Sequence, residues 1–109
     1  MSYGIHITRA SKWFESMSES ISLEELKTYF NSKADFEYSN DYSISGPGSS
    51  VFSVKGDFFI WTHEEYKVPF SYHEGRITVS RAGDEEIEKM KEIAIDLSAV
   101  VQGDEGEIY

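Results

Sequence analysis

The chain has 109 residues, a length typical of one domain, and carries 20 acidic against 10 basic side chains, which gives a formal net charge of −10. Nucleic-acid affinity rests on Lys and Arg that neutralise phosphates, so this composition argues against a direct nucleic-acid partner. The absence of cysteine excludes disulfides and thiolate chemistry, and the longest apolar run, Phe58 to Trp61, is far shorter than the ~18 residues that cross a bilayer.

The N-terminal segment MSYGIHITRASKW lacks the apolar stretch of a signal peptide, so a cytoplasmic protein that does not enter a membrane is expected. Residues 3–8 alternate between apolar and polar, the period-two pattern of a half-buried strand. The polar segment from Arg9 to Ser20 favours a loop with a short helical turn. Ser22-Leu23-Glu24-Glu25 has the form of a capping box, which predicts a helix that runs to about Ser32.

The middle of the chain predicts short strands separated by turns. Residues 36–38 alternate and begin a second strand, and the run SISGPGSS at 43–50 predicts a turn or mobile loop. Residues 51–54 and 58–62 are then expected to form two strands around the turn Lys55-Gly56-Asp57. Within the second of these, the continuous apolar run Phe58 to Trp61 indicates a strand buried on both faces.

Residues 63–68 are expected to be a charged connection. Residues 69–73 and 76–80 bracket Glu74-Gly75, which predicts a hairpin. Near the C-terminus, residues 99–102 and 107–109 predict two short strands around a turn at 103–106.

The strongest helical pattern lies between these segments, from Gly83 to Ser98, with Asp84 as the expected N-cap. Its outer face is expected to be charged, with a Glu85–Lys89 pair one turn apart. The predicted inward stripe, flanked on both sides by Ile93 and Ile95, consists of Ile87, Met90, Ala94, Leu97 and Val101.

This order of elements predicts one α+β domain over residues 1–109. An antiparallel or mixed sheet of about five to six strands should carry two main helices packed on it.

The three histidines of the chain are candidates for metal binding or acid–base catalysis. His63-Glu64-Glu65 offers ligands close together, but position 67 is Lys67 where the zinc motif H-E-x-x-H requires a second histidine. His6 and His73 resemble the pair of a two-histidine phosphodiesterase, yet such an enzyme must attract a polyanion that this chain would repel. No metal, no cofactor and no catalytic residue are therefore expected.

Carboxylates occur beside aromatic residues, and interfaces favour Tyr and Trp anchors that acidic groups would adapt to a Lys- or Arg-rich partner. An alternative is that Tyr38, Tyr42 and Trp61 are core residues and that the acids form a solvated rim. The candidate partner-binding residues are Asp41, Tyr42, Asp57, Glu64, Glu65, Tyr66 and Glu74.

The two ends of the chain carry distinctive strings. YGIHITRA with Trp13, then ISLEE at 21–25, open the chain, and Met90-x-x-Ile93-Ala94 and VQGDEGEIY at 101–109 close it. Together these strings resemble a group of small uncharacterised bacterial proteins over roughly half of the chain. Leu26 stands where that group usually has Trp in its first helix, and the resemblance implies no catalytic role.

In size, acidity and α+β make-up the chain also resembles the immunity proteins of contact-dependent growth inhibition and related toxin systems. This second resemblance implies a monomeric, non-enzymatic inhibitor that covers the active site of a basic toxin domain, a nuclease. One alternative is a small cytoplasmic housekeeping domain with a ligand pocket or weak hydrolase activity that uses His6, His63 or His73. A self-associating structural protein is another.

Overall fold

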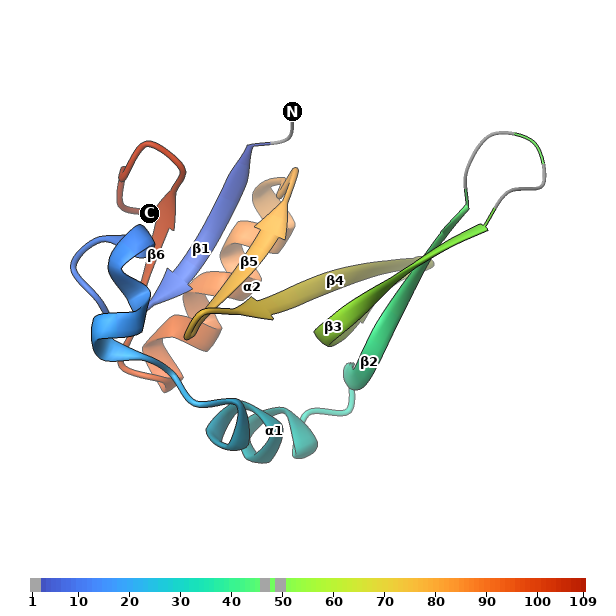
Figure 1. Ribbon diagram of the computed structural model, residues 1–109, viewed down its shortest axis with the longest axis horizontal. Helices are drawn as coiled ribbons and strands as arrows, with labels where there is room; N and C mark the ends of the chain where they lie inside the picture. Colours follow the sequence, from blue (N-terminus) through green and yellow to red (C-terminus); the bar gives the residue numbers. More distant parts are fainter. Residues whose placement is uncertain (1–2, 46–47, 49–50) are drawn as a thin grey trace.

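The computed structural model describes residues 3–45, 48 and 51–109, and within them the chain forms one antiparallel sheet with two α-helices and a 3-10 helix (Figure 1). The six strands lie in the order β2-β3-β4-β5-β1-β6. This arrangement confirms the predicted α+β class. In chain order the elements are β1 (Gly4–Thr8), the 3-10 helix η1 (Trp13–Glu19), α1 (Leu23–Asn31), β2 (Phe36–Ser45), β3 (Val51–His63), β4 (Tyr66–His73), β5 (Arg76–Ser80), α2 (Asp84–Asp96) and β6 (Val100–Gly103).

Both α-helices cover the same face of the sheet, where they bury the core. Alternate residues of each strand point to this face, and the register Ile5 to Val79 and Phe59 to Phe70 brings them into rows. Full burial of one Ile, Val or Phe side chain stabilises the fold by about 1.5–3 kcal/mol. The fully buried side chains of this core include Ile7, Leu26, Phe59, Phe70, Ile77, Met90 and Ile93.

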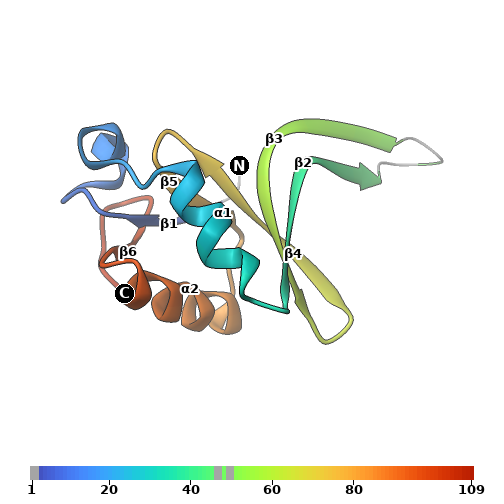
Figure 2. The same cartoon turned by 90° about the horizontal axis from the view of Figure 1, so that it is seen from below.

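The opposite face of the sheet is covered only in part, by η1. Its ring Trp13 stacks on His6 of β1 with centroids 4.0 Å apart, and Ser16 donates a hydrogen bond of 2.6 Å to the carbonyl of Glu74. Seen from below, β2 and β3 curve away from the flat end of the sheet, so this uncovered face is concave (Figure 2).

The caps of the two helices differ from one another. Ser22 caps α1 as predicted, because its Oγ accepts a hydrogen bond of 3.1 Å from the amide of Glu25. The predicted cap Asp84 is wrong: Gly83 occupies the N-cap in an extended conformation, and Asp84 is the first helical residue. The carboxylates of the first turn still interact favourably with the helix dipole.

The stripe prediction for α2 is correct for Met90, Ile93, Ala94 and Leu97, which are buried. It is wrong for Ile95, whose side chain is 79% exposed. Two residues advance a helix by about 200°, so a helix that buries Ile93 against one sheet must turn Ile95 towards solvent.

The predicted turn at Lys55-Gly56-Asp57 is also wrong, because β3 runs without interruption from Val51 to His63. β2 is longer than expected and pairs with β3 along this length, with an irregularity between Ser39 and Asp41. The ladder satisfies the backbone groups that a turn would have left exposed. Of the run predicted as a loop at 43–50, residues 46, 47, 49 and 50 lie outside the described residues.

The charged connection predicted at residues 63–68 contains a turn and the start of β4. β3 and β4 are joined by a tight hairpin in which His63 pairs with Tyr66 and Glu64 has a φ of 54°. The apolar run Phe58 to Trp61 is buried on both faces, as predicted. In the part of the chain that the structure describes, no helix combines the length and the apolar character needed to cross a membrane.

The β4–β5 turn at Glu74-Gly75, which the sequence predicts correctly, provides a test of the fold. Gly75 has a φ of +80°, and a Cβ built there would lie 2.9 Å from the Cα of Ser20. We expect Gly75→Ala to lower the free energy of unfolding by about 2–4 kcal/mol, from backbone strain and the clash. Gly106→Ala is the matched control, because Gly106 has a φ of +86° and open space around it. Equal losses in urea denaturation would contradict the packing of η1 on this turn.

Candidate functional site

The β3–β4 hairpin and the outward face of α2 form an acidic surface, defined here by Glu64, Glu65, Asp84, Glu85 and Glu88. His63 Nε2 lies 2.7 Å from Glu85 Oε2, at an angle outside that of a hydrogen bond, so the end of the hairpin is beside the first turn of α2. All five carboxylates are exposed. The fold therefore brings together acids that are about 20 positions apart in the sequence.

Aromatic groups lie against this acidic surface. A shallow hollow of about 360 Å³ is floored by Trp61 and His63, whose rings stack with centroids 4.7 Å apart, and is rimmed by carboxylates of α2. Tyr66, the next ring along the hairpin, is 69% exposed. A partner could therefore meet both charge and rings in this region.

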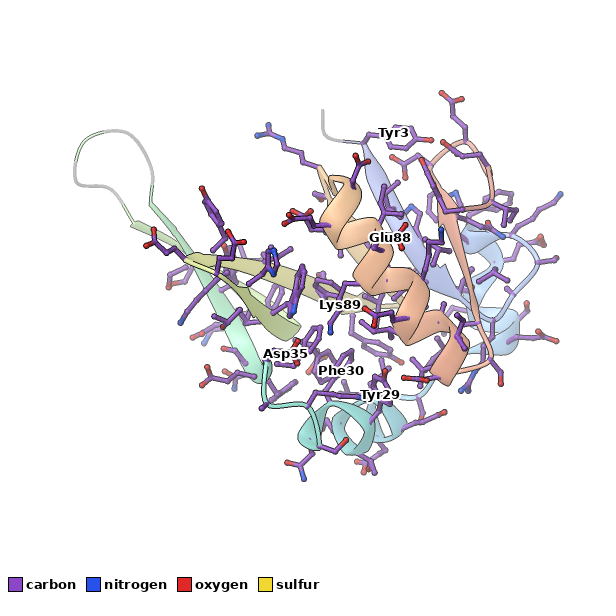
Figure 3. All side chains as sticks on the ribbon, turned by 180° about the vertical axis from the view of Figure 1, so that it is seen from behind. Tyr3, Tyr29, Phe30, Asp35, Glu88 and Lys89 are labelled. Atoms are coloured by element: carbon purple, nitrogen blue, oxygen red, sulfur yellow. The ribbon has the colours of Figure 1, made fainter. Side chains whose placement is uncertain are left out.

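One cation of this region, Lys89, is directed inwards. Lys89 Nζ lies 3.1 Å from Asp35 Oδ2, which also accepts a hydrogen bond of 2.9 Å from the indole of Trp61. Figure 3 shows Lys89 and Asp35 side by side, between α2 and the start of β2. Burial alone raises the pKa of Asp35, but the hydrogen bonds from Lys89 and Trp61 outweigh it and lower that pKa. The ion pair links α2 to the start of β2 and keeps Lys89 away from the surface acids, of which Glu88 has Lys91 Nζ 3.5 Å from its Oε1.

The seven residues predicted to bind a partner do not share one surface. Glu64, Glu65 and Tyr66 lie together in the hairpin. Glu74 is at the other end of β4, about 25 Å away at ~3.3 Å per residue, where it lies 3.4 Å from Arg76. The sequence pattern therefore found one part of the acidic surface and missed the part on α2.

The other three predicted residues lie on β2 and β3. Asp57 accepts a hydrogen bond of 2.5 Å from the hydroxyl of Tyr38, and Asp41 lies at the irregularity in β2. Tyr42 packs against Phe58 on the concave face, with ring centroids 5.9 Å apart. Among the described interactions, none of these three has a contact to residues 64–66 or to α2.

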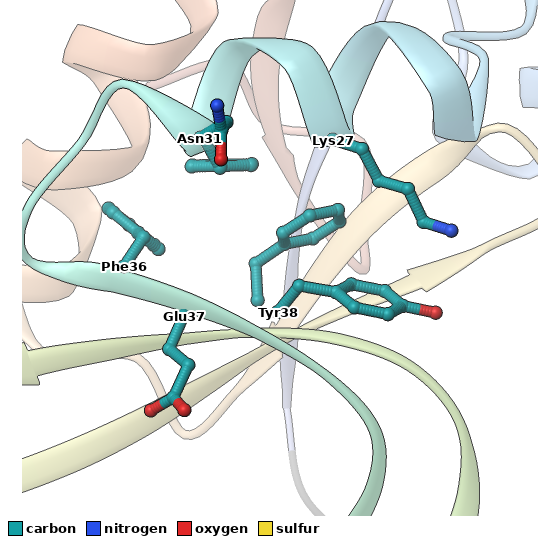
Figure 4. Close-up of a pocket in the computed structure, with 7 residues that line it drawn as sticks. Lys27, Asn31, Phe36, Glu37 and Tyr38 are labelled. Carbon is teal, nitrogen blue, oxygen red and sulfur yellow. The ribbon is translucent and has the colours of Figure 1, made fainter.

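A cleft of about 420 Å³ separates α1 from β2 (Figure 4). Its floor consists of the rings Phe30 and Phe59, and the ammonium of Lys27 lies 4.6 Å from the centroid of Tyr38 at its mouth. Because Lys27 covers this mouth, we assign the cleft to packing between α1 and the sheet.

His6 is a buried histidine at the junction of the two chain ends. Its side chain accepts or donates two hydrogen bonds, Nδ1 with Thr78 Oγ1 at 2.8 Å and Nε2 with Asp104 Oδ1 at 2.7 Å. Burial lowers the pKa of His6, against the opposing effect of Asp104. Neutral His6 then donates from Nε2 to Asp104 and accepts from Thr78 at Nδ1.

The opening and closing strings of the sequence meet around this histidine. Asp104 also accepts a hydrogen bond of 2.7 Å from the amide of Gly4, and Gln102 accepts one of 2.9 Å from the amide of Trp13. Burial alone raises the pKa of Asp104, but the bonds from Gly4 and His6 outweigh it and lower that pKa. Nearby, the hydrogen bond to Glu107 raises the pKa of Tyr3 to about 12. Sequence spacing gave no indication of this cluster, because its members come from opposite ends of the chain.

The three histidines do not form a common site. His63 faces α2, whereas His6 and His73 lie on the concave face. Among the described residues, no group of three or more His, Asp and Glu side chains is placed to hold a metal ion. The chain matches no family model, no curated protein and no solved structure.

The lowered pKa of His6 predicts how stability depends on pH. Below about pH 6.5 the unfolded chain binds a proton that folded His6 resists, so the stability that His6 contributes is complete above this pH and is lost as the pH falls. Replacing His6 by Asn removes this titrating group, and we expect the free energy of unfolding of the variant to fall less than that of the wild type between pH 7 and pH 5.

Urea denaturation at several pH values measures this difference. His73→Asn is the matched control, because it also removes one histidine but from an exposed position. An unchanged pH slope in His6→Asn, or an equal change in both variants, would contradict the assignment of the proton to His6.

Proposed function

We propose that this protein is an immunity protein that binds and neutralises a basic toxin domain through the acidic surface of the β3–β4 hairpin and α2. The observation that supports this proposal is the gathering of Glu64, Glu65, Asp84, Glu85 and Glu88 beside the rings of His63 and Tyr66. Five of the 20 acids of the chain thus lie next to these rings.

The charges of the acidic surface affect association with a partner more than they affect folding. Exposed ion pairs contribute about 0–1 kcal/mol each, so the cluster adds little to stability. Repulsion among the carboxylates of the cluster lowers stability instead, and a bound cationic partner would relieve this repulsion. A net charge of −10 accelerates the encounter with such a partner, and this acceleration weakens as salt screens the field.

The rings supply the second requirement of a tight complex. Aromatic side chains in the centre of an interface carry much of the binding energy, and surrounding polar groups exclude water. Tyr66 projects from the hairpin next to Glu64 and Glu65, so one docking event can engage ring and carboxylates together. The carboxylates of Glu64 and Glu65 would occupy the cationic site that a nuclease uses for phosphate.

Charge reversal tests the proposal. We expect Glu64→Lys combined with Glu65→Lys to weaken binding of the toxin domain encoded by a neighbouring gene by about 10–100-fold, at ~1 kcal/mol per reversed charge. Glu15→Lys combined with Glu19→Lys is the matched control, since it changes the net charge equally at exposed positions of η1. Calorimetry at low and high salt measures both the affinity and its screening.

Two results would contradict the proposal. The first is equal weakening by the hairpin variant and the η1 variant, which would show a general charge effect without a site. The second is failure of the wild-type protein to bind that domain or to protect cells that express it.

A further inference from the structure

The concave face of the sheet contains a groove of about 610 Å³, on the opposite side from α1 and α2. This volume lies within the range of small-molecule sites, which is about 300–1,000 Å³. Although 20 of the 109 residues are acidic, no Asp or Glu is among the described residues that line the groove. The groove is therefore chemically unlike the acidic surface of the helix-covered side.

One end of the groove is polar and rigid. The cross-strand pairs Ser71 to Thr78 and Thr78 to His6 place hydroxyl and imidazole groups in a row across β4, β5 and β1. Trp13 closes this end by stacking on His6, with an angle of 10° between the rings. The face of Trp13 turned to His6 is thus occupied, and the rest of the indole lines the groove beside the row of polar groups.

Arg76 supplies the positive charge at this corner. Its guanidinium lies 5.1 Å from the centroid of Trp13, and its side chain is only 12% exposed. Both of its hydrogen bonds leave from Nη1, at 3.1 Å to Ser16 Oγ and at 3.4 Å to Glu74 Oε2. Nε is buried and has no hydrogen-bond partner among the described residues. One donor of the guanidinium is therefore unsatisfied, and a carboxylate that approaches Arg76 would add a charge-assisted bond to this cation.

The other end of the groove is apolar. Phe58 and Pro69 face it from neighbouring strands, Tyr42 and Val54 extend it along the β2–β3 ribbon, and Phe58 packs on Tyr42. A ligand in the groove thus meets hydrocarbon at one end and a guanidinium with hydroxyl groups at the other.

We propose that this groove binds a planar aromatic monocarboxylate, with the ring system on Trp13 and Phe58 and the carboxylate at Arg76. One negative charge matches one guanidinium that already has Glu74 nearby, whereas a dianion would add repulsion from a protein of charge −10. A planar aromatic body matches the rings Trp13, Tyr42 and Phe58 that line the groove. This site is independent of the proposed toxin-binding surface, because the two lie on opposite faces of the sheet.

The probe for the experiment is 2-naphthoate, compared with 2-naphthamide, 2-naphthyl phosphate and cyclohexanecarboxylate. The amide lacks the negative charge, the phosphate carries a second one, and cyclohexanecarboxylate keeps the carboxylate but is not planar. The chain has two Trp residues, and their indole N–H signals in a nitrogen-15 NMR spectrum report on the two faces separately. We expect 2-naphthoate to shift the Trp13 signal, to leave the Trp61 signal in place, and to bind at least about tenfold more tightly than each of the other three compounds.

Two variants and one control test whether 2-naphthoate binds in the groove. Val54→Glu places a carboxylate at its apolar end and should weaken 2-naphthoate binding about tenfold, whereas the neutral control Val54→Gln should weaken it much less. Val54 is 45% exposed, so both variants should fold. Arg76→Gln should remove the preference for 2-naphthoate over 2-naphthamide.

Three results would overturn the inference. These are no shift of the Trp13 signal at millimolar 2-naphthoate, equal affinity for 2-naphthoate and 2-naphthamide, and equal effects of Val54→Glu and Val54→Gln. None of them bears on the toxin-binding proposal, which is tested with a different partner and with variants of the hairpin.

Discussion

The packing of α1 and α2 against a single face of the sheet determines the rest of the molecule. Met90 and Ile93 of α2 and Leu26 of α1 are buried against the rows that contain Ile7 and Phe59. Once these side chains are buried, the outward face of α2 must carry the polar residues, and the opposite face of the sheet is covered only in part, by η1. The ion pair between Lys89 and Asp35 links α2 to the start of β2 at the edge of this core.

Two surfaces of different character follow from this one-sided packing. On the helix side, carboxylates from the hairpin and from α2 gather near exposed rings, and on the concave side a groove contains Arg76 but no carboxylate. Net charge alone hides this contrast, because a chain of −10 can still present one surface with a local positive group. The proposed functions use these surfaces separately, one for a cationic protein and the other for a small anion.

The sequence predicted the features that depend on neighbouring residues. The Ser22 cap, the Glu74-Gly75 turn and the burial of Phe58 to Trp61 were correct, because capping, turn formation and apolar patterning act over a few positions. The turn at Lys55-Gly56-Asp57 was wrong, because its local preference is overridden by pairing of β3 with a long β2.

Features that depend on distant contacts could not be predicted. Spacing cannot show that His6 meets Asp104, that Glu85 approaches His63, or that the seven acidic and aromatic candidates divide among several surfaces. The candidate site was therefore recovered only at Glu64, Glu65 and Tyr66, while its α2 half required the tertiary structure. The NMR amide shifts caused by titration with the basic toxin domain test the central claim most directly. The account predicts shifts concentrated at residues 64–66 and 84–88, and shifts concentrated in β4 and β5 on the concave face would contradict it.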